Sequence, residues 1–324
     1  MKQWIKTAAI GAMVLAAMAG AGCGNGEGAK KQVALVQLME HKALDEANQG
    51  FRDGLKENGF DDSKVSFIQE NAQGDQSNLA SIVTRLKEKK PDLVCAISTP
   101  AAQNLANEIH DIPIVGTAIT DYQQAKLVDS NEKPGRNVTG VSDMSSVEAQ
   151  MKLGLSLVPN AKKVGLIYSS SEINSQIQAD RMKKYCKDNH IEVMEKTVTS
   201  INDLQQVAEA FAGNVDFIYV PTDNVISSAL PALIKVTDEA KIPVIGGDSN
   251  MAKNGALAGV SINYYRLGEQ AGAMAAKILS GKAKPADMPI EYQKDMDLVI
   301  NKKSAEILGI TVPKELADKA EMIQ

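Results

Sequence analysis

The sequence predicts an α/β protein of two lobes, each built around a doubly wound parallel sheet. The first observation behind this prediction is that short apolar runs alternate with amphipathic helical stretches from residue 33 onwards. The second is that the same order of elements starts again near residue 146. The third is that strands in both halves end in polar residues, as in open sheets that bind ligands at their carboxyl edge. Helices between strands imply right-handed parallel units.

The first half contains four predicted strands and three helices. The strands cover residues 33–38, 65–68, 94–97 and 112–116. The helices between them cover residues 44–58, 75–89 and 101–109. Residues 121–137 are rich in Asp, Asn, Pro and Gly, and predict a loop that leads to a crossing segment at 137–141.

The second half repeats the pattern. Its predicted helices cover residues 146–157, 174–189, 202–212 and 225–240, and its strands 164–168, 191–193, 217–220 and 243–246. A helix at 264–279, a strand at 297–301 and a short helix at 304–308 follow. These late elements can return to the first lobe, which predicts several hinge crossings.

The amino terminus predicts export and a lipid anchor. Lys2 and Lys6 precede an uncharged stretch that is too short to span a membrane comfortably, so residues 1–22 are a predicted signal peptide. Small residues directly before Cys23 resemble a bacterial lipoprotein signal, in which Cys23 is acylated; an ordinary secretory signal is the alternative. Residues 23–31 are a predicted flexible tether to the membrane surface.

Composition narrows the function. The formal net charge of −5 over 324 residues argues against nucleic acid as a partner. The three histidines form no metal signature, and no cofactor is predicted. Glycine-rich phosphate loops and a nucleophile elbow are absent from the sequence, so we predict no catalytic residue and no enzyme. Cys95 and Cys186 either pair in an exported protein or, as we expect, are small core residues.

Two strand ends suggest a ligand with two charges. After Ser98, Thr99 is the predicted N-cap of a helix that a proline opens, and we expect the free amides of Ala101 and Ala102 to face a carboxylate. Thr222, Asp223 and Asn224 follow the strand at 217–220 and offer an acid to an ammonium group. An anion site and a cation site one lobe apart predict a zwitterionic ligand. The alternative is that these residues only cap their helices.

Further candidates follow other strands. Glu172 is a second candidate for the ammonium group, against the alternative of a solvated loop acid, and Asp248 is a similar candidate. Met39 is a candidate for apolar contact, although it suits a core equally well. The remaining predicted binding residues are His41, Thr120, Asp121, Tyr168 and Asn174.

The chain resembles type I solute-binding proteins of ABC transporters, and more narrowly the tryptophan/tyrosine-type (TrpX-like) family. The resemblance rests on residues 41–45, 98–102, 120–121, 137–142, 171–175, 220–224 and 255–258. One departure is Tyr122, where that family more often has proline. The resemblance implies a ligand-closed hinge, an aromatic or large hydrophobic amino acid as ligand, and crossings near residues 138–143, 258–263 and 289–296.

These expectations combine into one predicted function. The chain is expected to be a monomeric, lipid-anchored, extracytoplasmic protein that delivers an amino acid to an ABC permease. The first lobe is predicted to comprise residues 32–139 and 262–291, and the second 140–261 and 292–324. A ligand-sensing receptor of the same fold is the alternative. An exported enzyme ranks below both.

Overall fold

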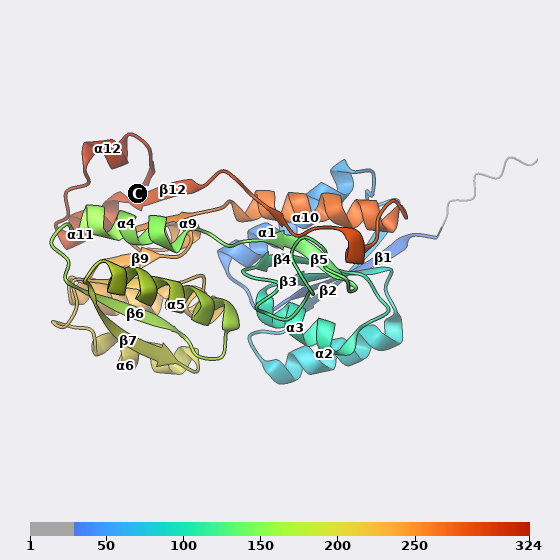
Figure 1. Cartoon of the computed structure of the whole chain (residues 1–324), viewed down its shortest axis with the longest axis horizontal. Coiled ribbons are helices and arrows are strands. Elements are labelled where there is room, and N and C mark those ends of the chain that lie inside the picture. The colour runs from blue at the N-terminus through green and yellow to red at the C-terminus, as the bar shows by residue number, and fades with distance from the viewer. Residues whose placement is uncertain (1–28) are drawn as a thin grey trace, which may run out of the picture.

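The structure, a computed structural model, describes residues 29–324 as two lobes side by side (Figure 1). The predicted signal peptide, Cys23 and most of the predicted tether lie outside the described residues. Within residues 29–324, no helix has both the length and the apolar character needed to cross a membrane.

The first lobe contains a six-stranded sheet in the order β11-β5-β4-β3-β1-β2, with every neighbouring pair parallel. Its strands are β1 (Lys31–Gln37), β2 (Val65–Asn71), β3 (Leu93–Ile97), β4 (Ile114–Ile119), β5 (Val138–Ser142) and β11 (Glu291–Tyr292). All five residues of β3 are buried, as expected of a central parallel strand covered on both faces.

Helices cover both faces of the first sheet (Figure 1). One pair consists of α2 (Gln76–Lys89) and α3 (Thr99–Glu108), and the other of α1 (Lys42–Glu57) and α10 (Tyr264–Leu279). A single-turn 3₁₀ helix covers Pro285–Asp287. Helices α1 and α10 pack very closely, because a Cβ on Gly268 would lie 2.2 Å from the carbonyl oxygen of Ala47.

The second lobe contains a seven-stranded sheet in the order β13-β12-β10-β9-β8-β6-β7. Its strands are β6 (Lys163–Ser169), β7 (Glu192–Val198), β8 (Phe217–Val220), β9 (Val244–Gly246), β10 (Ala258–Ser261), β12 (Asp297–Asn301) and β13 (Glu321–Ile323). The sheet is parallel except that β12 runs antiparallel to β10. The chain leaves this lobe at the end of β10 and returns at the start of β12, so the two strands must run in opposite directions.

Eight helices accompany the second sheet within the described range. They are α4 (Val147–Leu157), α5 (Ile173–Asp188), α6 (Leu204–Glu209), α7 (Asn224–Ser228), α8 (Leu230–Glu239), α9 (Ser249–Lys253), α11 (Lys302–Leu308) and α12 (Lys314–Ala317). A 3₁₀ turn at Ile201–Asp203 precedes α6. The helix predicted at 225–240 is therefore two helices. It breaks at Ala229, because Pro231 in the first turn of α8 has no amide hydrogen to continue α7.

The strands of the second lobe alternate between two cores. Leu166 and Tyr168 pack on the side of α4 and α5, whereas Ile167 packs on the side of α6 and α8. The cysteines are separated in the same way. Cys95 is buried in the first lobe and Cys186 in the second, and both are free thiols.

Three segments connect the lobes, at residues 143–146, 262–263 and 293–296 (Figure 1). All of β5 belongs to the first sheet, since Ser142 pairs with Ile119 of β4. The first crossing therefore begins three residues beyond the predicted boundary after residue 139. Tyr292 likewise pairs within the first sheet, one residue beyond the predicted boundary after residue 291.

Candidate functional site

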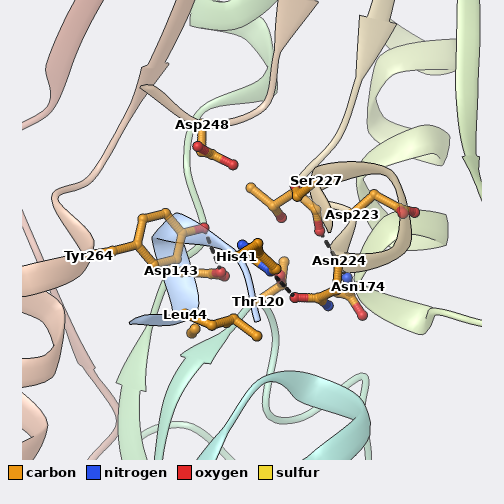
Figure 2. A pocket seen from close by; sticks show the side chains of 12 residues that line it. His41, Leu44, Thr120, Asp143, Asn174, Asp223, Asn224, Ser227, Asp248 and Tyr264 are labelled. Atoms are coloured by element: carbon orange, nitrogen blue, oxygen red, sulfur yellow. Dashed lines mark hydrogen bonds between the residues drawn. The ribbon is translucent and has the colours of Figure 1, made fainter. Parts of the chain in front are cut away.

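A cavity lies between the lobes, where residues that follow strand ends of both sheets meet (Figure 2). Seven predicted binding residues line it. They are His41, Thr120, Asn174, Thr222, Asp223, Asn224 and Asp248. Five further residues complete the wall: Leu44, Ala118, Asp143, Ser227 and Tyr264. The described residues that line this cavity include no lysine and no arginine.

Asp143 is a buried carboxylate with one free oxygen. It directly follows β5 and is 4% exposed. Its Oδ2 accepts a hydrogen bond from the Tyr264 hydroxyl at 3.0 Å, whereas its Oδ1 is buried without a partner of hydrogen-bonding geometry. Burial raises the pKa of Asp143 to about 6, against the opposing effect of the Thr120 and Tyr264 hydroxyls. An unpaired buried acceptor of this kind calls for a donor from a ligand.

Asp248 supplies a second carboxylate on the opposite side of the cavity. It caps the short helix α9 by accepting the Met251 amide at 3.1 Å. Figure 2 shows its carboxylate directed towards the space between Tyr264 and Ser227. Burial raises the pKa of Asp248 to about 6, and the nearby carboxylates of Asp143 and Glu46 add to the rise. Two carboxylates with raised pKa values in one cavity favour a cationic group.

His41 joins the lobes directly. It stands at the start of α1 in the first lobe, and its Nε2 lies 3.1 Å from Oδ1 of Asn224 in the second. The Asn224 amide nitrogen donates to Glu172, so its Oδ1 must accept and His41 must donate through Nε2–H. Burial lowers the pKa of His41, which favours the neutral ring.

Asn174 presents a second unpaired oxygen. Its Nδ2 donates to Glu172 Oε2 and to the carbonyl of Thr222, both at 2.9 Å. Its Oδ1 is buried without a partner. Asn174 therefore adds an acceptor to the cavity wall that Asp143 and Asp248 also form.

The predicted anion site at the start of α3 differs from expectation. Ser98 rather than Thr99 is the N-cap, with φ of 110°. The amides expected to be free are paired within the turn, because Ala101 donates to Ser98 Oγ and Ala102 to the Ser98 carbonyl. Thr99 Oγ1 accepts the amide of Thr120. Ser98, Thr99 and Ala101 thus do not line the cavity, but Thr99 holds Thr120, which does.

The carboxylates of Glu172 and Asp223 are occupied by donors of their own lobe. Asp223 accepts from the Ser169 amide at 2.6 Å, the Ser175 hydroxyl at 2.7 Å and the Ile226 amide at 2.9 Å. Burial raises the pKa of both acids, and the Asp223 charge further raises that of Glu172. Every oxygen of the two carboxylates therefore already accepts at least one hydrogen bond.

The other predicted residues lie away from the cavity. Tyr168 is buried in the second lobe and donates to Glu195 at 2.6 Å, because its position on β6 faces the α5 side of the sheet. Asp121 forms an ion pair of 3.7 Å with Arg181 across the lobes. Met39 lines a separate interlobe groove with Val225 and Ile201.

Asp143 and Tyr264 were missed by the sequence prediction. The sequence places Asp143 in a predicted crossing, although it follows a buried strand, as Asp223 and Asp248 do. Tyr264 was read only as the first residue of a helix. Its role follows from the second crossing, which places the start of α10 against Asp143.

Comparison with known proteins identifies the class. The model of the family described as ABC transporter substrate binding protein matches residues 32–323. A tyrosine-binding protein of Clostridioides difficile (strain R20291) is 40% identical over 284 residues, which are 87% of this chain and 81% of that protein. This chain therefore belongs to the ABC transporter substrate-binding protein family, as its resemblance predicted.

Two solved structures bear on the lobe arrangement. An ABC domain of Streptococcus pneumoniae in complex with L-Trp is 38% identical, with a TM-score of 0.88 over 91% of this chain and 100% of that chain. The ligand-free, open structure of a Clostridium difficile substrate-binding protein is 40% identical, yet its TM-score is 0.69 over 91% and 99%. At similar sequence identity, this chain therefore superposes better on the L-Trp complex than on the open, ligand-free structure.

Proposed function

We propose that this chain is the extracytoplasmic binding component of an ABC importer and that it binds an aromatic amino acid, tyrosine or tryptophan, between its lobes. The observation that carries the proposal is the unpaired Oδ1 of Asp143 in an acidic interlobe cavity. The tyrosine-binding relative and the L-Trp complex support the choice of an aromatic side chain.

The ammonium group is proposed to lie among Asp143, Asp248 and Asn174. An ammonium offers three donors, and these residues supply two carboxylates and one amide oxygen. A buried charge is tolerated where it is both paired and hydrogen-bonded. This assignment replaces the earlier one to Glu172 and Asp223, whose oxygens already accept bonds within their lobe.

The rest of the ligand is proposed to use the hydroxyl and apolar parts of the wall. The hydroxyl of Ser227 is a donor for the carboxylate. Thr99 holds Thr120 in the wall by accepting its backbone amide. Leu44, Ala118 and the ring of Tyr264 offer apolar contact to an aromatic side chain.

Binding is tested by calorimetry on residues 24–324 with L-tyrosine, L-tryptophan and their N-acetyl forms. We expect the free amino acids to bind and the N-acetyl forms, which lack the ammonium group, to fail. Asp143→Asn should weaken binding by roughly 30-fold or more, because a charged hydrogen bond is lost. The exposed Asp111→Asn is the matched control and should bind like the wild type. Equal binding of the N-acetyl forms would contradict the ammonium site.

Lipid anchoring and delivery to a permease are proposed with this function and tested in cells. Wild-type protein should partition into detergent and Cys23→Ser should not. Cells that lack the protein should take up the bound amino acid more slowly. Unchanged uptake, together with intact binding, would instead favour the sensing alternative.

A further inference from the structure

Glu172 has an unusual position for a buried acid. It is 2% exposed and stands at the N-cap of α5, yet its side chain does not cap that helix. Its carboxylate reaches to α7 instead and accepts the backbone amides of Asn224 at 3.3 Å and of Val225 at 3.1 Å. It also accepts the side-chain amides of Asn174 at 2.9 Å and of Asn224 at 2.5 Å. Glu172 therefore ties the start of α5 to the start of α7.

These bonds determine which atoms of two asparagines face the cavity. Because both Nδ2 groups donate to Glu172, both Oδ1 atoms point away from it. The Oδ1 of Asn224 accepts from His41 of the other lobe, and the Oδ1 of Asn174 is the unpaired acceptor. With the Asn224 amide turned over, its NH₂ group would meet the N–H of His41, and with the Asn174 amide turned over, the unpaired acceptor would become a donor. Glu172 thus fixes Asn224 Oδ1 as the partner of His41 and Asn174 Oδ1 as an unpaired acceptor.

The same residue joins two segments that touch the first lobe. Ile173 follows Glu172 directly, and Val225 donates its amide to it. Both side chains pack against the hydrophobic core of the first lobe. The interlobe contacts of Ile173, Asn224 and Val225 therefore depend on one carboxylate that itself lies outside the lining of the cavity.

We propose that Glu172 is a positioning residue, which orients Asn174 and Asn224 for ligand binding and lobe closure without contacting the ligand. The proposal rests on the function proposed above. A positioning role and a ligand-contact role differ in whether the negative charge of Glu172 is needed. A ligand contact needs the negative charge, whereas a positioning role needs only acceptor atoms at the Oε2 position.

Two variants separate these roles. In Glu172→Gln, the side-chain carbonyl oxygen can take the position of Oε2 and keep both asparagines in place. The NH₂ group of the glutamine then takes the position of Oε1 and faces only the backbone amide of Val225. In Glu172→Met, a chain of similar length has no acceptor. We expect the dissociation constant for L-tyrosine or L-tryptophan to rise less than about fivefold in the Gln variant and at least about 30-fold in the Met variant. Similar large losses in both variants would show that the charge contacts the ligand. Wild-type affinity in both would remove any role for Glu172.

A ligand-independent measurement keeps this test separate from the proposed function. In the ¹⁵N spectrum of the ligand-free chain, the side-chain NH₂ group of Asn224, which donates to Glu172, should be protected from hydrogen exchange in the wild type and the Gln variant. In the Met variant it should lose protection while the backbone amides of β8 keep theirs. A protected Asn224 NH₂ group in the Met variant would overturn the positioning role, even if no amino acid binds. Failure of binding with the expected exchange pattern would count against the proposed function alone.

Discussion

At the scale of single residues, the distinguishing feature of the cavity is a set of buried oxygens without hydrogen-bond partners. Glu172 and Asp223 have donors for their oxygens, whereas Asp143 Oδ1 and Asn174 Oδ1 have none. Sequence reasoning found the acids at strand ends but could not tell these two situations apart. Asp143 was not among the predicted binding residues, whereas Glu172, Asp223 and Asn174 were. Which oxygen is free depends on side-chain orientation, and a linear pattern does not contain that information.

The two acids of the cavity predict a pH dependence of binding. Burial raises the pKa of Asp143 and Asp248 to about 6, and an ammonium group binds their ionised forms. Affinity for L-tyrosine or L-tryptophan should therefore be roughly 10- to 100-fold lower at about pH 5 than at about pH 7. Calorimetry across this range measures the effect. Asp143→Asn should reduce the pH dependence to that of Asp248 alone, and a flat wild-type profile would contradict the ionised acids.

The stability of the ligand-free chain depends on pH in the opposite direction to ligand affinity. Because their folded-state pKa values are raised, these acids favour the ligand-free fold most below about pH 4, and that contribution is lost as pH rises through about 6. The ligand should therefore stabilise the chain more at pH 7 than at pH 5. A larger ligand-induced rise in melting temperature at pH 5 would be inconsistent with this linkage.

At the scale of elements, periodicity predicted most strands and helices, and the exceptions have identifiable causes. The break between α7 and α8 was readable from Pro231, whose missing amide ends a helical run. The antiparallel direction of β12 could not be predicted from periodicity. It arises because the chain enters β12 from the first lobe. The N-cap of α3 was predicted at Thr99 but is Ser98. Its φ of 110° is a rare conformation for a residue other than glycine, so the sequence does not predict it.

The contact between α1 and α10 predicts a strong effect of one methyl group. A Cβ on Gly268 would lie 2.2 Å from the Ala47 carbonyl oxygen, so Gly268→Ala must push the helices apart. We expect a loss of about 3 kcal/mol in the free energy of unfolding, despite the helix preference of alanine. Urea denaturation measures it, and the exposed Lys277→Ala on the same helix should change stability by less than about 0.5 kcal/mol. A neutral Gly268→Ala would contradict the close packing.

At the scale of the whole molecule, function depends on two lobes that meet. The sequence predicted two lobes and their crossings, because the strand–helix order restarts and late elements return. It did not predict which residues form hydrogen bonds or ion pairs between the two lobes. The pairs His41 with Asn224, Glu46 with Asn250 and Asp121 with Arg181 are each more than 50 residues apart and lie on opposite lobes.

The ion pair between the exposed Arg181 and the partly buried Asp121 predicts a modest effect on closure. Arg181→Gln should weaken ligand binding by about fivefold at most, mainly through faster dissociation, because an ion pair open to solvent on one side contributes about 1 kcal/mol. Stopped-flow measurements at low and high salt check this, and the effect should shrink as salt increases. Arg136→Gln, which breaks a pair within the first lobe, is the control. An equal effect of both variants would argue against a role in closure.

The most direct test of the central claim is a crystal structure of residues 24–324 grown with L-tyrosine or L-tryptophan. We predict closed lobes, with the ligand ammonium within hydrogen-bonding distance of Asp143 Oδ1, Asp248 and Asn174 Oδ1, and with Glu172 still bonded to Asn174 and Asn224. An ammonium bonded to Glu172 or Asp223 instead, or a ligand outside the interlobe cavity, would contradict the account.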